Sequence, residues 1–358
     1  MIFVTGGAGF IGANFLSDWF AQSDESALVI DKLTYAGNLD NLSSFTADPR
    51  MQLERLDICD AESIAALLRE HRPRAVIHLA AESHVDRSIL GPSDFVRTNV
   101  NGTFSLLEAA RAFWESASTA ERAAFRFIHV STDEVFGSLE PEEPAFNEAS
   151  PHAPNSPYSA TKAASDHLVR AYHRTYGLPT ILTCCSNNYG PYQFPEKLIP
   201  LTILNAFERR ALPVYGDGLQ ERDWLHVADH CSALRLVLER GIPGEAYYVG
   251  GRNCIKNVDV VHSVCRLLDE LSPRAGGLHA EDIRHVRDRP GHDRRYAVDP
   301  SKIESELGWR PKERFESGLR KTVLWYLNNR AWVQRVRSGE YRSWIERQYG
   351  TGAAHPRH

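Results

Sequence analysis

The sequence begins with MIFVTGGAGFIG, residues 1–12, and this stretch determines which fold to expect. Ile2–Thr5 is a short apolar run typical of a buried strand. It is followed at once by Gly6, Gly9 and Gly12, in a G-x-x-G-x-x-G arrangement that opens a helical pattern. A strand, a glycine-rich turn and a helix in this order form the phosphate-binding unit of dinucleotide-binding α/β proteins, where backbone N–H groups at the helix N-terminus hold the anion.

Each glycine has its own physical reason, and an acidic residue completes the pattern. Gly6 permits the tight turn, Gly9 lets the backbone approach a pyrophosphate, and Gly12 lets the helix pack on the strand. Asp31 follows the second predicted strand, about 20 residues beyond the loop, where a carboxylate accepts hydrogen bonds from ribose hydroxyls and repels a 2′-phosphate. The predicted cofactor is therefore NAD, although Lys32 weakens the discrimination against NADP.

Short β-rich runs alternate with amphipathic stretches through the first half of the chain. The predicted strands are Ile2–Thr5, Leu28–Ile30, Gln52–Leu56, Ala75–Leu79, Phe125–Val130 and Thr180–Thr183. The predicted helices are Phe10–Phe20, Ala61–Glu70, Ser93–Trp114 and Ser156–Tyr176, with Asp60 and Ser156 as N-caps. This rhythm predicts an α/β fold: a Rossmann-type doubly wound parallel sheet with helices on both faces, followed by a smaller, mixed α/β C-terminal domain.

The pattern becomes irregular after Gly190, where several prolines interrupt it, so we place a domain change there. We expect a Rossmann domain over residues 1–189, a second domain over 190–350 and a frayed tail over 351–358. The helix-like segment Val227–Arg240 and the apolar run Ala246–Gly250 are expected to return to the first sheet, as part of residues 226–250. The two further predicted helices are Leu319–Tyr326 and Tyr341–Tyr349.

Composition narrows the classes of function. Lys and Arg number 41 and Asp and Glu number 46, so the formal charge of −5 offers no general attraction to nucleic acid or to an anionic membrane. The six cysteines show no C-x-x-C spacing and predict reduced thiols in a cytoplasmic protein, and the sequence begins on a strand rather than a signal peptide. No apolar run reaches the roughly 20 residues that span a bilayer. No metal is predicted, because the 15 histidines lack metal-ligand spacing.

Two groups of residues predict catalysis. Tyr158 and Lys162 lie four apart on one helix face, where an ammonium is expected to lower the pKa of the phenol from about 10 and make it a usable base. Thr132, Asp133 and Glu134 follow the strand Phe125–Val130, and unlike environments could make one carboxyl an acid and the other a base. Taken alone, the first pair could be a surface contact and the second group a helix cap.

Several motifs together closely resemble the extended short-chain dehydrogenase/reductase family. They are Gly6–Gly12, Asp31–Asn38, Leu79–Ser88, Thr132–Glu134, Tyr158–Lys162, Ser186–Pro191, Arg222–Trp224 and Asp288–His292. Within that family the chain is similar to the enzymes that dehydrate nucleotide-linked glucose, and the resemblance covers nearly the whole chain.

The resemblance implies a lyase of deoxysugar biosynthesis that converts dTDP-glucose to dTDP-4-dehydro-6-deoxyglucose and water, with NAD tightly bound and regenerated in each turnover. Tyr158 would take the proton of the sugar 4-hydroxyl, Lys162 would tune Tyr158 and bind the nicotinamide ribose, and Thr132 would orient the hydroxyl. Glu134 would remove the C5 proton, and Asp133 would protonate the departing 6-hydroxyl.

The resemblance also implies binding residues and a partner. The expected cofactor-binding residues are Gly6, Gly9, Phe10, Ile11, Gly12, Asp31, Lys32, Leu33, Thr34, Asp57, Ile58, Leu79, Ala80, Ala81, Glu82, Ser83, Thr98, Tyr158, Lys162 and Asn188. The expected substrate-binding residues are Ser83, Thr132, Asn187, Lys197, Leu198, Pro213, Val214, Tyr215, Arg222, Asn257, Asp288, Arg289, Pro290, Gly291 and His292. Arg222 and Arg289 suit a diphosphate on physical grounds also, because a guanidinium binds it in a bidentate manner. A homodimer is expected through the helices Ser93–Trp114 and Ser156–Tyr176.

Three alternatives remain open from the residues. One is a dehydratase acting on a UDP-, CDP- or GDP-sugar, because the preference for thymine rests on the resemblance alone. Another is a nucleotide-sugar 4-epimerase, against which the Asp133-Glu134 pair argues, because epimerisation has no elimination step. The most remote is a non-catalytic NAD-binding sensor, which would need none of the catalytic residues.

Overall fold

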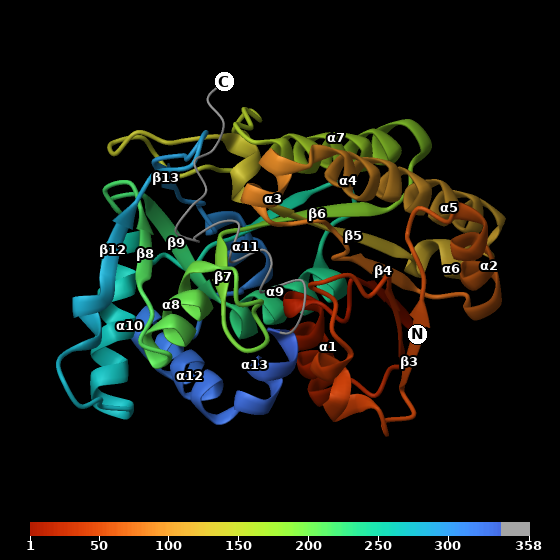
Figure 1. The fold of residues 1–358 in the computed structure, drawn as a ribbon. Coiled ribbons are helices and arrows are strands. Elements are labelled where there is room, and N and C mark those ends of the chain that lie inside the picture. Colours follow the sequence, from red (N-terminus) through yellow and green to blue (C-terminus); the bar gives the residue numbers. More distant parts are fainter. Residues whose placement is uncertain (338–358) are drawn as a thin grey trace.

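The computed structural model describes residues 1–337, and its central element is a seven-stranded parallel sheet (Figure 1). The strands are β1 (Ile2–Thr5), β2 (Ala27–Asp31), β3 (Met51–Arg55), β4 (Ala75–His78), β5 (Arg126–Thr132), β6 (Thr180–Cys185) and β10 (Ala246–Val249). Their order across the sheet is β10-β6-β5-β4-β1-β2-β3. The order reverses between β1 and β4, as in a doubly wound sheet, so the predicted fold class is confirmed.

Helices cover both faces of this sheet, as the buried strands require. One face carries α1 (Phe10–Gln22), α9 (Val227–Arg240) and α11 (Ser301–Leu307), and the other carries α2 (Ala61–His71), α5 (Thr103–Ser116) and α7 (Pro157–Tyr176). Asp60 and Ser156 cap α2 and α7 by accepting the backbone N–H groups of Ser63 and Ser159, so both predicted N-caps are confirmed.

The expected helix over Ser93–Trp114 is present, within an unbroken helical run from Pro92 to Ser116, but it is not a regular α-helix throughout. After α3 (Val85–Leu90), the chain forms α4 (Pro92–Phe95), a π-helical segment (Val96–Gly102) and then α5. The wider turn carries Asn99, whose buried side chain accepts a hydrogen bond from the Glu82 N–H and donates to the Glu82 carbonyl and the Thr161 hydroxyl. These bonds compensate for the poorer helix geometry and join the loop after β4 to α7.

The second half of the chain adds two small sheets and several helices. Its strands are β7 (Asn187–Tyr189), β8 (Leu212–Tyr215), β9 (Glu221–His226), β11 (Cys254–Lys256), β12 (Ile283–Val286) and β13 (Arg295–Tyr296). Its helices are α8 (Leu198–Phe207), α10 (Asn257–Leu271), α12 (Phe315–Asn328) and α13 (Arg330–Val336), while α6 (Thr119–Ala124) belongs to the first half. Strand β9 pairs with β7, β11 and β13, and β8 pairs with β12. Both sheets and the long helices share a second hydrophobic core.

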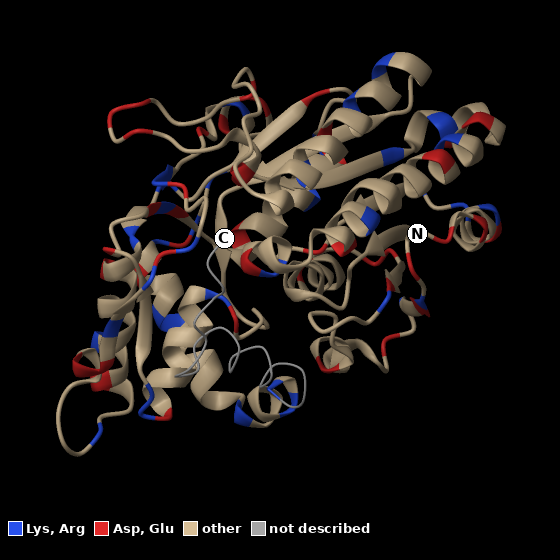
Figure 2. Cartoon of the chain, turned by 45° about the horizontal axis from the view of Figure 1, so that its top comes forward, with Lys and Arg blue, Asp and Glu red and all other residues tan. Residues whose placement is uncertain are grey.

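The predicted helix Leu319–Tyr326 lies within α12, whereas the predicted helix Tyr341–Tyr349 and the tail 351–358 lie outside the described residues. Strand β10 pairs in parallel with β6, and α9 packs against α1, although both follow residues that belong to the small sheets. Among residues 1–337, no helix is long and apolar enough to cross a bilayer. Figure 2 shows both signs of charge on the helices at either end of the molecule.

Candidate active site

A cleft lies at the carboxyl ends of the parallel strands, beside the point where the strand order reverses. Its walls come from the glycine-rich loop after β1, the ends of β2, β4 and β5, the start of α7 and the segment after β6. Ligands of open α/β sheets bind at this place, because the loops after neighbouring strands diverge there.

The glycine-rich loop has no room for side chains where the sequence places its glycines. Gly6 has a positive φ of 71°, and a Cβ on it would lie 2.7 Å from the Ala80 nitrogen. A Cβ on Gly12 would overlap the Gly6 carbonyl oxygen, and one on Gly9 would lie 3.2 Å from the same atom. The loop therefore presents bare backbone to the cleft, as a pyrophosphate requires.

The carboxylate of Asp31 is held in place by the same loop. Asp31 is buried at the end of β2, and its two oxygens accept hydrogen bonds from the backbone N–H groups of Ala8 at 3.0 Å and Leu33 at 2.8 Å. Nζ of Lys32 lies 2.8 Å from Oδ2 of Asp57. The bare loop and this carboxylate fit the diphosphate and ribose of NAD, and Lys32 is paired rather than directed to a 2′-phosphate.

The structure brings the expected cofactor residues together with one exception. The expected cofactor residues that line the cleft are Gly6, Gly9, Phe10, Ile11, Gly12, Asp31, Lys32, Thr34, Asp57, Ile58, Leu79, Ala80, Ala81, Glu82, Ser83, Thr98, Tyr158, Lys162 and Asn188. The exception is Leu33, which has a positive φ of 56° and lines a neighbouring cavity with Tyr35 and Arg87.

Tyr158 and Lys162 lie on the first turns of α7, and both are almost completely buried. Nζ of Lys162 donates a hydrogen bond to the carbonyl of Val130 at 2.8 Å. Burial raises the pKa of Tyr158 well above its usual value of 10, and the negative charge of Glu134 raises it further. The expected lowering of this pKa is therefore wrong for the protein by itself, because desolvation is the largest effect and nearby negative charge adds to it.

Thr132, Asp133 and Glu134 end β5 and begin a short 3-10 turn. Oγ1 of Thr132 accepts a hydrogen bond from the Glu134 N–H at 3.3 Å and donates one to Oδ1 of Asp133 at 3.3 Å. Thr132 is thus a helix cap, and all three residues also line the cleft. The helix-cap interpretation is therefore confirmed, and the catalytic interpretation stays a prediction.

The two carboxyl groups have different electrostatic surroundings. Burial, and then the charge of Glu134, raise the pKa of Asp133 well above its usual value of 3.8. Burial also raises the pKa of Glu134, but Arg289, Lys197 and Arg222 act against that rise. Asp133 therefore keeps its proton more readily, whereas Glu134 is supported as an anion.

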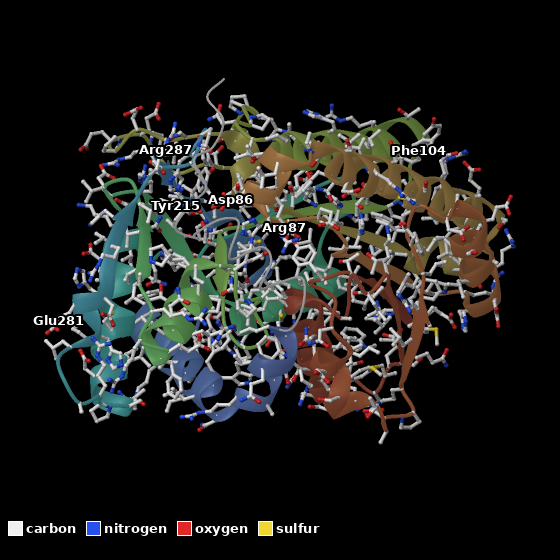
Figure 3. The ribbon with its side chains drawn as sticks, in the orientation of Figure 1. Asp86, Arg87, Phe104, Tyr215, Glu281 and Arg287 are labelled. Carbon is white, nitrogen blue, oxygen red and sulfur yellow. The ribbon has the colours of Figure 1, made fainter. Side chains whose placement is uncertain are left out.

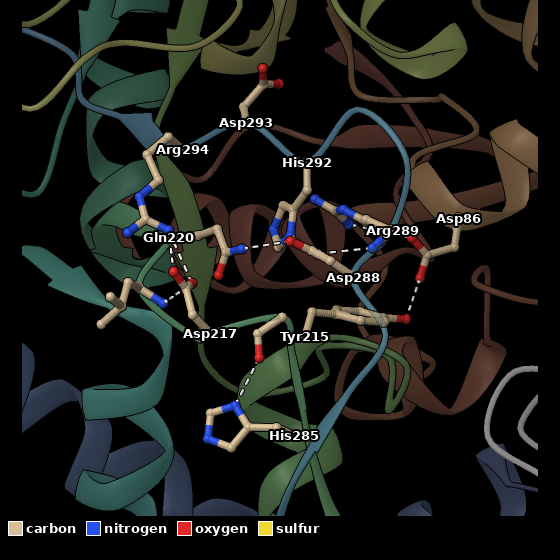
Figure 4. Close-up of polar contacts among 12 residues, drawn as sticks. Asp86, Tyr215, Asp217, Gln220, His285, Asp288, Arg289, His292, Asp293 and Arg294 are labelled. Carbon is tan, nitrogen blue, oxygen red and sulfur yellow. Dashed lines mark hydrogen bonds and ion pairs between the residues drawn. The ribbon is translucent and has the colours of Figure 1, made fainter.

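A second group of polar residues lies beside these carboxyls, on the small sheets and the loop after β12 (Figure 4). Asp86 accepts hydrogen bonds from the Tyr215 hydroxyl at 3.0 Å and from Nη1 of Arg289 at 3.4 Å. Asp288 contacts His292 at 2.6 Å and accepts a hydrogen bond from Gln220 at 3.0 Å. The two Asp86 contacts join α3 of the first half to β8 and to the loop that contains Arg289. Figure 3 shows Asp86 close to Tyr215.

The expected substrate residues fall into two groups. Ser83, Thr132, Asn187 and Lys197 line the cleft, and Nζ of Lys197 donates to the Ser83 carbonyl at 2.9 Å. Outside its lining lie Leu198, Pro213, Val214, Tyr215, Arg222, Asn257, Asp288, Arg289, Pro290, Gly291 and His292. The side chain of Val214 is buried in the second core, so it offers a ligand only its backbone. The backbone N–H of Asn257 is bonded to the Gln220 carbonyl.

Sequence reasoning did not single out three buried acids around this site. Asp86 is described above, Glu196 accepts hydrogen bonds from Tyr35 and Arg87, and Asp166 lies on α7 behind Lys162. The only sequence signal for such an acid is a charged residue within an otherwise apolar stretch. This signal is weak, because the partners that compensate for burial of the charge are distant in the sequence. Among residues 1–337, no group of three or more side chains is arranged to hold a metal ion.

The sheet, the glycine-rich loop and the Tyr158–Lys162 pair define an extended short-chain dehydrogenase/reductase. The profile of the GDP-mannose 4,6 dehydratase family matches residues 3–322. The chain belongs to this family of nucleotide-sugar dehydratases, and within it to the branch of the dTDP-glucose 4,6-dehydratases. The resemblance found in the sequence is therefore confirmed.

Three relatives support this assignment. A dTDP-glucose 4,6-dehydratase of Shigella flexneri is 56% identical over 356 residues, which cover 97% of this chain and 98% of the relative. One of Neisseria meningitidis serogroup B is 56% identical over 98% of this chain and 99% of its own length. The crystal structure of DesIV, the dTDP-glucose 4,6-dehydratase of Streptomyces venezuelae with NAD and TYD bound, matches with a TM-score of 0.85 and 46% identity, covering 94% of this chain and 99% of DesIV.

Proposed function

We propose that this chain is a lyase that converts dTDP-glucose to dTDP-4-dehydro-6-deoxyglucose and water, with NAD as its cofactor. The observation that carries the proposal is the meeting of Tyr158, Asp133 and Glu134 in one cleft with a dinucleotide loop. Relatives that share 56% identity over nearly the full length are dTDP-glucose 4,6-dehydratases. The product is a deoxysugar precursor, which places the reaction in deoxysugar biosynthesis.

The first step is oxidation at C4 of the glucose. Tyr158 acts as the base that accepts the proton of the 4-hydroxyl, and Thr132 orients that hydroxyl. Lys162 follows Tyr158 by one turn of α7, its ammonium is fixed on the Val130 carbonyl, and its charge favours the phenolate. When bound, NAD supplies a hydride acceptor at C4 and later a hydride donor at C6.

The second step is elimination of water across C5 and C6. Glu134, which has cationic side chains acting on it, removes the C5 proton. Asp133, whose pKa burial raises, donates its proton to the departing 6-hydroxyl, so that water rather than hydroxide leaves. A pair of carboxyls with opposite roles is the element that a 4-epimerase does not need.

The nucleotide is held by the group of residues on the small sheets. Arg222 is buried and Arg289 is partly buried, and both act electrostatically on Glu134, so the diphosphate that they bind lies beside the sugar. We propose the expected substrate residues as this binding surface, with Val214 contributing through its backbone.

The chain is divided into two domains under the same proposal. Residues 1–189 together with 226–250 form the NAD-binding domain, which the pairing of β10 with β6 supports. The rest of 190–350 forms the sugar-nucleotide domain, which the shared second core supports.

The assembly is a homodimer through the helices around α5 and α7. Leu90, Val96 and Phe104 are large apolar side chains exposed beside or on α5, and Tyr176 is exposed at the end of α7. Figure 3 shows Phe104 at the outer edge of the molecule. Exposed apolar side chains gathered on neighbouring helices favour a second copy as the partner. The six free cysteines favour the cytoplasm.

One experiment tests the reaction and its base preference together. The purified protein is incubated in deuterated water with dTDP-glucose and, in parallel, with the UDP, CDP and GDP analogues. We expect a 4-keto sugar with deuterium at C5 from dTDP-glucose, at a kcat/KM at least tenfold above the others. Formation of a 4-epimer, or thermal stabilisation by NAD without any keto sugar, would refute the proposal.

A further inference from the structure

Behind the cleft, α7 carries a fully buried carboxyl group, that of Asp166. Its Oδ2 accepts a hydrogen bond from the Ser131 hydroxyl at 2.7 Å, and its Oδ1 lies 3.1 Å from Nε2 of His129. Asp166 follows Lys162 by four residues, so both side chains lie on the same face of α7. Burying a carboxylate is costly unless it is paired with a charge, and the nearby charge is that of Lys162.

Lys162 needs such a partner, because its surroundings disfavour the ammonium form. Its Nζ is buried and donates to the Val130 carbonyl, which offers a dipole but no full charge. Burial lowers the pKa of Lys162 below its usual value of 10.5, and the charge of Asp166 is the largest effect acting in the opposite direction. Cys184 and Cys185 add smaller effects in that direction only as thiolates, and burial raises their pKa values.

We propose that Asp166 is a positioning residue, which keeps Lys162 charged and aimed at Tyr158 from behind the cleft. This inference rests on the proposed function, in which Lys162 assists proton removal by Tyr158. Ser131 completes the arrangement, because it lies next to Thr132 on β5 and fixes one oxygen of Asp166. The carboxylate thus joins the two elements, β5 and α7, that carry the catalytic residues.

Other titratable groups around Asp166 do not replace it. They are His129 on β5, Cys184 on β6, Tyr248 on β10, His152 before α7, and Lys162 and Arg170 on α7. Burial lowers the pKa values of both histidines and raises those of Cys184 and Tyr248, so all four are neutral near pH 7. Asp166 is therefore the anion of this cluster, opposite the two cations of α7.

The test is the pH profile of kcat for wild type, Asp166→Asn and Ser165→Ala. Asp166→Asn keeps the shape of the side chain and removes its charge, so Lys162 loses its proton at lower pH. We expect the alkaline limb of the profile to move down by about 1 to 3 pH units, the effect of one charge at close range. Ser165→Ala is the matched control, because Ser165 lies next to Asp166 on α7. The change removes its buried hydrogen bonds to the carbonyls of Asn99 and Thr161 without changing a charge. Its limb should stay in place.

Binding of NAD and the thermal midpoint are measured on every variant. An Asp166→Asn protein that binds NAD and has the wild-type limb would overturn the proposal. If that variant does not fold, Asp166→Ser gives a smaller neutral side chain for the same measurement. Lack of dehydratase activity in the wild type would instead refute the proposed function, so the two failures are distinct.

Discussion

Nζ of Lys32 lies 2.8 Å from Oδ2 of Asp57, so the cation next to Asp31 in the sequence is already paired. We expect Asp57→Asn to release it and to raise the affinity for NADP relative to NAD about tenfold, equivalent to about 1.4 kcal/mol. Affinities are measured by the fluorescence of the bound reduced cofactors. The control is Lys32→Met in the Asp57→Asn background, which should cancel the gain. An unchanged affinity ratio in Asp57→Asn would contradict the role of the pair.

The carboxyl pair predicts two distinct defects. Glu134→Gln and Asp133→Asn should both bind NAD and dTDP-glucose and should lower kcat about 10²- to 10⁴-fold. Glu134→Gln should also stop exchange of the C5 proton with solvent, which mass spectrometry detects as missing deuterium. Asp133→Asn should allow that exchange while water release is slow. Equal exchange rates in the two variants would show that the roles of acid and base are misassigned.

The glycine-rich loop predicts a steric effect on cofactor binding. Gly12→Ala would place a methyl group against the Gly6 carbonyl, so we expect the affinity for NAD to fall at least about tenfold by calorimetry. Gly91→Ala is the control, because its nearest new contact would be the Arg87 oxygen at 4.0 Å. The prediction fails if both variants bind NAD with equal affinity.

Burial of Asp166 predicts how stability depends on pH. Its pKa is about 6 in the folded protein, against its usual value of 3.8, so the folded state binds this proton more tightly than the unfolded state. The resulting stabilisation is present below pH 4 and is lost as the pH rises through about 6, at a cost of up to about 3 kcal/mol. Relative to wild type, the free energy of unfolding of Asp166→Asn should therefore rise between about pH 4 and pH 7. Denaturation experiments give the free energy of unfolding of both proteins at each pH. A difference between the two that stays constant from pH 4 to pH 7 would contradict the prediction.

The exposed side chain of Phe104 predicts the dimer surface. Phe104→Glu should raise the dissociation constant of the dimer at least about tenfold, because a carboxylate would be buried at the interface. Leu324→Glu is the control, since Leu324 is 37% exposed on α12, at a distance from α5 and α7. Analytical ultracentrifugation gives both constants. A dimer that persists in Phe104→Glu would place the interface elsewhere.

Local sequence patterns predicted the fold well where a structural feature depends only on residues that are close together in the sequence. Strand β1, the loop ending at Gly12 and the caps Asp60 and Ser156 depend on neighbours within a few residues, and the structure confirms them. The strands of the small sheets were not predicted individually. β8 pairs with β12 across some seventy residues, and such pairing leaves little trace in short sequences.

In the site, too, features set by neighbouring residues were predicted and features set by distant segments were not. The cleft gathers residues that stand next to recognisable motifs, but the buried partners behind them come from distant segments. Asn99 is an example, because the π-helical turn that carries it looks like ordinary helix in the sequence. The pKa of Tyr158 is another, because burial decides it and burial depends on the packing of the whole cleft. Asp166 was missed for the same reason.

Strand β10 closes the large sheet only after residues 186–245 have passed through the small sheets. In a nascent chain emerging from the ribosome, β6 therefore remains an open edge until Ala246–Val249 has been synthesised, and β8 still lacks its partner β12 at that point. The strands of the large sheet are thus all synthesised before the small sheets are complete, because β11, β12 and β13 follow β10 in the chain.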